Sequence, residues 1–316
     1  MIPERAVWIE AHCSTANLGA GFDVFGLALN KYVDRVQVRM ASARTVRIKA
    51  RGPYSRELPR APSKNSAGPP AQALLDRSGL NIGVEITVEK NIPPGLGLGS
   101  SGATAAACAK AMNHLLQLNL SNDELVRTAS LGEAAVSGSA HTDNVAASLL
   151  GGFVVAYGKP VRTVSVKPPA KLSVVVVSPK TRLPKNKTGF ARRLVPKKIE
   201  TGSAVLNVGR ASAIALGFAR GDIDLIGSGM EDAIAEPHRE SLVPGYRTVK
   251  MVALAAQASG VAISGAGPSV VAFVDKTKQD PKKIGRVMIR EFSKNGVEST
   301  FFVTSPAGGA RIIRSA

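Results

Sequence analysis

The stretch that most constrains this chain runs from Pro93 to Gly102 and reads PPGLGLGSSG. It follows an alternating segment, 82–89, that predicts a half-buried strand, and it leads into an Ala-rich segment that predicts a helix from about Ser100 to 118. Glycines let successive backbone N–H groups converge on an anion, and a helix start adds unsatisfied N–H groups of its own. The stretch therefore predicts a turn that binds phosphate.

Three other interpretations of this turn compete. A Walker A loop needs Gly-Lys-Ser/Thr, and the stretch contains no lysine. Gly97, Gly99 and Gly102 match the spacing of a dinucleotide fingerprint, but the acidic candidate Asp123 falls at a predicted helix start instead of a strand end. The third is a turn that only lets the helix pack closely. The Pro-Pro pair before the glycines and the Ser-Ser pair after them favour a binding site.

Composition narrows the class of protein further. Among the 316 residues, 44% are hydrophobic and 20% are charged, which excludes a disordered chain. The formal charge of +18 indicates anionic partners, such as phosphate, nucleotide, carboxylate or nucleic acid. Two cysteines, Cys13 and Cys108, make a disulfide framework implausible and favour a reducing cytoplasm.

No membrane segment is predicted. The N-terminus lacks the apolar core of a signal segment, and the two long uncharged stretches, 91–109 and 251–274, are interrupted by Gly, Pro and Ser.

Periodicity predicts the remaining elements. The predicted strands are 5–12, 33–39, 45–50, 153–157, 172–178, 261–263, 270–274 and 298–303. The predicted helices are 67–77, a second from the capping box of Ser121 and Glu124 to about Ser137, and then 201–219, 222–234, 246–258 and 281–294. We expect an exposed loop at 52–70, a loop at 137–152 and poor order over 305–316.

Two further glycine turns lie between predicted strands. One runs from Ser264 to Ser269 (SGAGPS), and the other from Ser14 to Asp23 places polar side chains among glycines. Each alone is equally consistent with an ordinary turn, because Gly and Asn are turn residues.

Together, the three turns resemble motifs of the GHMP small-molecule kinases. The matching stretches are STANLGAGFDVFGLAL (14–29), PPGLGLGSSGATAA (93–106) and ISGAGPSVVAF (263–273). Two others, GSAHTDNVAASLLGG (138–152) and IAEPHRESLVPGY (234–246), are similar to the homoserine kinases within that family. The resemblance covers nearly the whole chain.

This resemblance implies an α+β fold with two domains. Residues 1–158 would resemble domain 2 of ribosomal protein S5, and residues 159–316 would be ferredoxin-like. ATP would bind between the halves, and a homodimer is usual. The implied reaction moves the γ-phosphate of MgATP to the side-chain hydroxyl of L-homoserine, giving O-phosphohomoserine for threonine synthesis.

Site residues follow from the same resemblance. The residues implied to contact the nucleotide are Asn65, Lys90, Pro93, Pro94, Gly95, Leu96, Gly97, Leu98, Gly99, Ser100, Ser101 and Gly102. Ser101 and Glu133 are implied to hold Mg²⁺, although spacing alone is also consistent with Glu133 on a solvated helix face. Lys90 is equally consistent with an ordinary lysine at a strand end.

The resemblance also implies an acceptor site. Asn17, Gly265 and His141 match substrate contacts, and Asp23 matches a residue that binds an ammonium group. Arg192 and Arg239 match a pair that clamps a carboxylate, which suits the planar guanidinium fork. Arg193 is an adjacent competitor for the first position.

Catalysis is less determined by the sequence. Thr188 is placed to reach the γ-phosphate, and Asn17 to orient the acceptor hydroxyl. Some relatives carry an aspartate base where this chain has Asn144, with Asp143 adjacent, so Asp143 is a weak base candidate. Phosphoryl transfer depends mainly on positioning and charge neutralisation, and it tolerates the lack of a dedicated base.

A nucleic-acid-binding protein is the alternative from a different class. It rests on the net charge and on residues 159–198, which contain no Asp or Glu. Phe190 is the only aromatic residue in that run, so few side chains there can stack on bases. The other alternative is a GHMP kinase with a mevalonate-like or shikimate-like acceptor.

Overall fold

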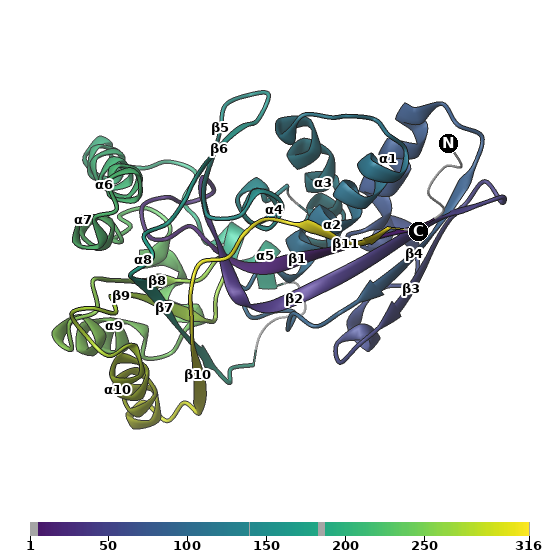
Figure 1. The fold of residues 1–316 in the computed structure, drawn as a ribbon. Coiled ribbons are helices and arrows are strands. Elements are labelled where there is room, and N and C mark those ends of the chain that lie inside the picture. Colours follow the sequence, from purple (N-terminus) through teal and green to yellow (C-terminus); the bar gives the residue numbers. More distant parts are fainter. Residues whose placement is uncertain (1–5, 139, 183–186, 316) are drawn as a thin grey trace.

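A computed structural model describes residues 6–138, 140–182 and 187–315. Two α+β halves lie side by side (Figure 1), each built on its own β-sheet. Two predicted features extend beyond the described residues. These are the start of the first strand at Arg5, and residues 183–186 of the segment 159–198 that contains no Asp or Glu.

The N-terminal sheet has seven strands, and its main path runs β11-β1-β2-β4-β3. β5 pairs with the inner part of β2, and β6 pairs with β5. All pairs are antiparallel except β3 with β4. Its strands are β1 (Ala6–Ala16), β2 (Phe25–Ala41), β3 (Val46–Arg51), β4 (Gly83–Glu89), β5 (Phe153–Tyr157), β6 (Arg162–Val166) and β11 (Arg311–Ser315).

Four helices cover one face of this sheet (Figure 1). They are α1 (Gly68–Ser78), α2 (Ser100–Leu115), α3 (Asn122–Ser137) and α4 (Thr142–Leu150). The central helix α2 is buried without interruption from Gly102 to Ala109, and all residues in that span are small. Small side chains let the neighbouring helices and the sheet approach α2 closely, which explains why a core with few aromatics is still dense.

The C-terminal half contains a second, antiparallel sheet of order β10-β7-β9-β8. Its strands are β7 (Leu172–Pro179), β8 (Gly260–Ile263), β9 (Val270–Asp275) and β10 (Ser299–Thr304). The chain order β7, helices, β8, β9, helix, β10 with the spatial order 4-1-3-2 is that of a ferredoxin-like domain, as predicted.

Both faces of the second sheet are buried. Along β7, Val174 and Val176 face one core cluster, and Val175 and Val177 face the other. This explains the continuous apolar run LSVVVVS, which is typical of a strand covered on both sides. The flanking helices are α5 (Lys187–Arg193), α6 (Thr201–Arg220), α7 (Ile223–Ser228), α8 (Glu236–Arg239), α9 (Tyr246–Ala255) and α10 (Pro281–Lys294).

An aromatic stack joins the two halves. Phe218 on α6 lies parallel to Phe153 on β5, with ring centroids 3.9 Å apart, and meets Phe273 on β9 edge to face at 6.3 Å. Because β5 belongs to the N-terminal sheet and β9 to the C-terminal sheet, one hydrophobic core continues across both.

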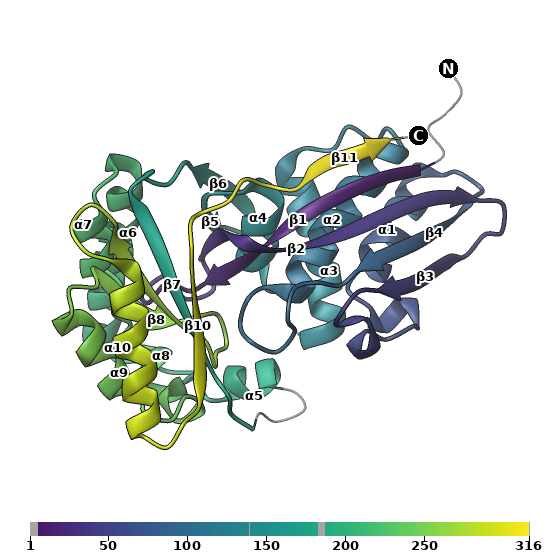
Figure 2. The ribbon, with the colours of Figure 1, turned by 60° about the horizontal axis from the view of Figure 1, so that its bottom comes forward.

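The predicted poor order of 305–316 is wrong. The chain returns from β10 to the N-terminal half, where β11 pairs antiparallel with β1 (Figure 2). Arg311 forms an ion pair with Glu10 of β1 at 2.6 Å, and the Ala310 N–H donates to Ser148 O at 3.0 Å. The free edge of β1 supplies the backbone partners that order residues 311–315.

Three other predictions need correction. The loop expected over 137–152 contains helix α4, because Val145, Ala146 and Leu149 are buried against the core. The helix expected over 222–234 ends at Ser228. The segment 52–70 is not uniformly exposed, since residues 65–68 are buried at the start of α1.

The predicted domain division at residue 158 stays a prediction. β6 and β11, which lie beyond that residue, pair within the N-terminal sheet. Among the described residues, no helix combines the length and apolar character needed to cross a membrane.

Candidate active site

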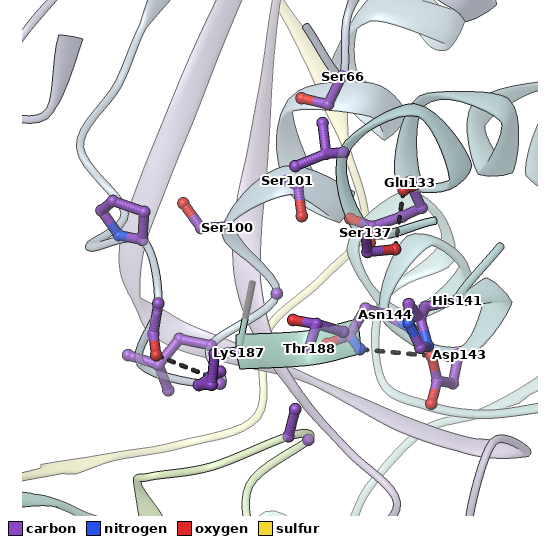
Figure 3. A pocket seen from close by; sticks show the side chains of 18 of the residues that line it. Ser66, Ser100, Ser101, Glu133, Ser137, His141, Asp143, Asn144, Lys187 and Thr188 are labelled. Carbon is purple, nitrogen blue, oxygen red and sulfur yellow. Dashed lines mark hydrogen bonds between the residues drawn. The ribbon is translucent and has the colours of Figure 1, made fainter. Parts of the chain in front are cut away.

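A cavity of about 290 Å³ opens between the two halves, and all three glycine turns contribute to its wall (Figure 3). Most of the predicted site residues line it. These are Asn17, Asp23, Lys90, Pro94, Gly95, Gly97, Leu98, Gly99, Ser100, Ser101, Glu133, His141, Asp143, Asn144, Thr188, Arg239 and Gly265. The structure thus brings together residues that are up to about 250 positions apart in the sequence.

The predicted phosphate turn connects β4 to α2 as expected, with Gly99 as the residue before the helix. Gly97 and Gly99 both have positive φ, at 78° and 62°. A Cβ at Gly97 would overlap Ser264 O, and one at Gly99 would overlap Ser14 Oγ. The phosphate turn therefore lies against the other two glycine turns, and only glycine fits at both positions.

A buried ion pair lies beneath the turn. Lys90 Nζ bonds to a carboxylate oxygen of Asp34, to Ser100 O at 2.6 Å and to Thr104 Oγ1 at 2.7 Å. The other Asp34 oxygen accepts the N–H groups of Asn91 and Ile92 at 2.8 and 2.9 Å. All three hydrogens of the Lys90 ammonium are thereby used within the protein, and they hold both ends of the turn. No local sequence pattern indicates the role of Asp34, which depends on a partner 56 residues away.

Glu133 and Ser101 face each other across the upper part of the cavity (Figure 3). Burial raises the pKa of Glu133, and a hydrogen bond from Ser101 partly offsets that rise. The buried atom Glu133 Oε1 has no hydrogen-bond partner among the described residues. A buried carboxylate oxygen without a partner, next to a hydroxyl, fits a hard cation. Mg²⁺ typically takes one or two protein ligands and completes its shell with phosphates and water.

The first glycine turn is anchored to the third. Asn17, with φ of 72°, donates from Nδ2 to Gly265 O at 2.7 Å, and its Oδ1 accepts the N–H of Asp23 at 3.1 Å. Asn17 is thus held between the two turns and fixes the position of Asp23 at the cavity wall.

Two arginines lie beside Asp23. Arg192 forms an ion pair with the Asp23 carboxylate, and Arg239, which is 5% exposed, donates to Gly265 O at 3.3 Å and to Ala191 O at 3.2 Å. Both guanidinium groups lie over the ring of Phe22. Arg193 instead stacks on Phe190 and is exposed, so it points away from this group.

The start of α4 brings three polar side chains into the cavity (Figure 3). His141 Nδ1 lies 3.9 Å from Asp23 Oδ1, and burial lowers the pKa of His141. Asp143 accepts the N–H of Asn144 at 2.7 Å, and Asn144 Oδ1 accepts the hydroxyl of Ser14 at 3.0 Å. Burial, and then the nearby charge of Asp23, raise the pKa of Asp143 to about 7.

Five predicted residues do not line the cavity: Asn65, Pro93, Leu96, Gly102 and Arg192. The Asn65 side chain bonds to Pro59 O at 2.8 Å and to the N–H of Ala67 at 3.0 Å, while its neighbour Ser66 lies in the wall. Leu58 and Pro59 from the same segment also line it, although the sequence analysis expected only an exposed loop there.

Lys187 is a cavity residue that the sequence analysis missed. It stands directly before Thr188, within a run of basic residues in which no single lysine is distinctive.

The fold and this site define a class of protein. Residues 67–152 match the family model described as the N-terminal domain of GHMP kinases, and residues 214–294 match that of their C-terminal domain. The chain therefore belongs to the GHMP kinase family, with the predicted α+β fold.

Within that family, several homoserine kinases match the chain from end to end. The homoserine kinase of Thermoplasma volcanium is 38% identical over 315 residues, with 98% of this chain and 97% of the relative covered. That of Natronomonas pharaonis is 41% identical over 308 residues, with 97% and 99% covered. The crystal structure of homoserine kinase from Cytophaga hutchinsonii superposes with a TM-score of 0.89 at 34% identity and covers 99% of each chain.

Proposed function

We propose that this chain is a homoserine kinase: it transfers the γ-phosphate of ATP to the side-chain hydroxyl of L-homoserine and forms O-phospho-L-homoserine. That product would feed threonine synthesis. The full-length similarity to homoserine kinases supports this proposal, and so does the arrangement of the cavity. A mevalonate-like or shikimate-like acceptor is the alternative that the acceptor assay below tests.

One observation carries the choice of an amino acid as acceptor. Asp23 and Arg239 line the cavity, and Asp23 forms an ion pair with Arg192, which lies just outside the lining. An amino acid carries both charges, so it can replace that pair with its ammonium on Asp23 and its carboxylate on Arg192 and Arg239. An acceptor with a carboxylate but no amine would leave the Asp23 charge uncompensated, at a cost in binding free energy.

The remaining acceptor contacts complete this assignment. Asn17 orients the acceptor hydroxyl, His141 contacts the substrate, and the Gly265 backbone closes the pocket. Asn17 and Arg239 both donate to Gly265 O, which holds the three groups together at the cavity wall.

The phosphate turn is the proposed nucleotide site. The residues assigned to it are Asn65, Lys90, Pro93, Pro94, Gly95, Leu96, Gly97, Leu98, Gly99, Ser100, Ser101 and Gly102. Of these, Lys90 and Asn65 would act by holding the wall in place, because their polar atoms are already bonded inside the protein.

Ser101 and Glu133 are assigned to Mg²⁺. When bound, the cation would neutralise charge on the phosphate oxygens. The buried and unpartnered oxygen of Glu133 supports this assignment.

The chain's own residues act mainly by positioning. Thr188 would contact the γ-phosphate, and Asn144 lies next to Gly99 and Ser14, where it holds the start of α2. With a pKa of about 7, Asp143 is about half ionised at neutral pH, so the fraction able to accept a proton from the acceptor hydroxyl rises as the pH rises through 7.

Three further proposals concern the whole chain. We place it in the cytoplasm, which the free buried thiols of Cys13 and Cys108 favour. We expect a homodimer. We also retain the division into residues 1–158 and 159–316.

The test is an assay of ADP release with MgATP across homoserine, threonine, mevalonate, shikimate and galactose. We expect kcat/KM for homoserine to exceed that for mevalonate and shikimate, which lack the ammonium, by at least about tenfold, and that for galactose, which lacks both charges, by about a hundredfold or more. Threonine keeps both charges, so it tests only the position of the hydroxyl. Preference for mevalonate or shikimate would refute the acceptor and keep the family. ATP-independent binding to polynucleotide that weakens steeply with salt would instead support the nucleic-acid alternative.

A further inference from the structure

Lys187, the first residue of α5, is a buried cation that the assignments above do not use. Its Nζ donates to Gly95 O in the phosphate turn at 2.7 Å and to Gly267 O in the third glycine turn. The residue is 8% exposed and lines the cavity. A lysine ammonium has three N–H groups, so one remains available to a ligand in that cavity.

The charge on Lys187 is uncompensated within the described part of the chain. No carboxylate there forms an ion pair with it, and both of its hydrogen-bond partners are neutral carbonyls. Burial, and then the positive charge of Arg239, lower the pKa of Lys187 to about 7. A buried cation of this kind is stabilised when an anion enters the same cavity.

Lys90 offers the contrast. It is also buried at the phosphate turn, but it has a carboxylate partner and all three of its N–H groups are bonded. Of these two lysines in the cavity wall, Lys187 is thus the one with a free donor and no counter-charge.

We propose that Lys187 is a direct cationic contact for the polyphosphate of the nucleotide. The proposal rests on the proposed kinase function. We favour phosphate over the acceptor carboxylate because Lys187 bonds to the phosphate turn itself, whereas the carboxylate already has Arg192 and Arg239 nearby. The bridge from Gly95 to Gly267 also lets one contact hold the phosphate turn and the C-terminal half around the same ligand.

Protonation provides a readout that a purely structural lysine would not give. With a pKa of about 7, Lys187 is protonated in roughly half of the molecules at pH 7.0. A bound polyphosphate will raise that pKa, so that Lys187 becomes fully protonated. Lys187 should therefore contribute roughly half a proton of uptake to nucleotide binding. The other charged and titratable groups in and beside the cavity include Arg239, Arg192, Asp23, Asp143, His141 and Glu133.

The experiment is calorimetry of MgATP binding without homoserine, at pH 7.0, in three buffers that differ in ionisation enthalpy. The variants are Lys187→Met, which removes the charge, and Lys187→Arg, which keeps the charge but cannot lose its proton. Lys180→Met is the matched control, because Lys180 is 62% exposed and pairs only with Glu298 at the surface. Asp143→Asn isolates the contribution of the neighbouring titrating group.

We expect Lys180→Met to take up as many protons as wild type, and Lys187→Arg to take up roughly half a proton fewer. The same difference should appear in the Asp143→Asn background, where the other group that titrates near pH 7 is absent. Lys187→Met should weaken MgATP binding by roughly tenfold to a hundredfold and AMP binding by much less. The unfolding temperature of each variant shows whether it is folded. If Lys187→Met does not fold, the proton uptake of Lys187→Arg tests the proposal.

Three results would overturn the inference. They are unchanged proton uptake in Lys187→Arg, an equal loss of AMP and ATP affinity in Lys187→Met, or a rise in the homoserine KM alone. A wild type that ignores homoserine but takes up the proton with MgATP would refute the proposed acceptor and leave this inference intact.

Discussion

At the residue scale, Glu133 gives the sharpest test of the metal assignment. Glu133→Gln keeps the shape of the side chain and removes the charge from its unpartnered oxygen. Since the cation neutralises phosphate charge in phosphoryl transfer, we expect kcat to fall by about a hundredfold or more. The measurement is kcat over a Mg²⁺ titration, with Glu298→Gln, a 72% exposed surface residue, as control. Unaltered Mg²⁺ dependence would refute the role.

The two arginines beside Asp23 provide a second residue-scale prediction. Arg192→Leu and Arg239→Leu should each raise the homoserine KM roughly tenfold to a hundredfold and change the ATP KM little, because a charge-assisted contact is lost. Arg193→Leu is the matched control, since Arg193 stacks on Phe190 outside the cavity. Arg192→Leu is the cleaner variant, because Arg239 also bonds to two backbone carbonyls. The clamp is misassigned if Arg193→Leu has the larger effect.

Asp143 predicts a pH dependence of stability. Its pKa is raised from 3.8 to about 7 in the folded chain, so between those pH values the folded state binds a proton that the unfolded state has lost. This contribution is therefore present below about pH 4 and disappears as the pH rises through 7. We expect the difference in unfolding free energy between Asp143→Asn and wild type to grow in favour of the variant by a few kcal/mol from pH 4 to pH 8. Urea unfolding at several pH values measures it, and a constant difference would contradict the assignment.

At the scale of elements, the turn between β4 and α2 depends on the buried pair of Lys90 and Asp34. Lys90→Met leaves the Asp34 carboxylate buried without its counter-charge, so we expect a loss of about 3–5 kcal/mol in unfolding free energy. The double variant with Asp34→Asn removes the charge but keeps an oxygen for the N–H groups of Asn91 and Ile92, so it should recover much of the loss. Urea unfolding compares the two.

If Lys90 instead acted only on the nucleotide, Lys90→Met would lower ATP affinity with little effect on stability, and the double variant would show no recovery. That result would return Lys90 to a direct contact role.

At the scale of the whole molecule, the chain's C-terminal strand closes the N-terminal sheet. Deleting residues 311–316 would expose the edge of β1 and remove the ion pair of Arg311 with Glu10. We expect a lower unfolding temperature, by about 2–6 °C, and a greater tendency to associate through the open edge. Arg311→Gln, which removes the ion pair alone, is the control, because partly exposed pairs contribute little. An unchanged unfolding temperature would mean that β11 contributes nothing to stability.

Local chemistry was enough to predict several parts of this protein. The capping box of Ser121 and Glu124 starts α3 as expected, since a cap depends on residues within one turn. The phosphate turn before α2 was predictable because glycine alone adopts its positive φ values without strain. Helix α10 and the buried strand β7 followed from periodicity and from a continuous apolar run.

Only the tertiary structure decided which side chains meet. The ion pair of Lys90 with Asp34, the ion pair of Arg192 with Asp23, and the contact of Lys187 with Gly95 each join residues more than 50 positions apart. No local pattern encodes such contacts. The order of β11 likewise depends on a free edge of β1 about 300 residues earlier in the chain. The sequence by itself determined where the backbone turns, because φ preferences belong to single residues. Burial and charge belong to groups of residues that only folding assembles, so they decided which polar groups of those turns remain free to bind a ligand.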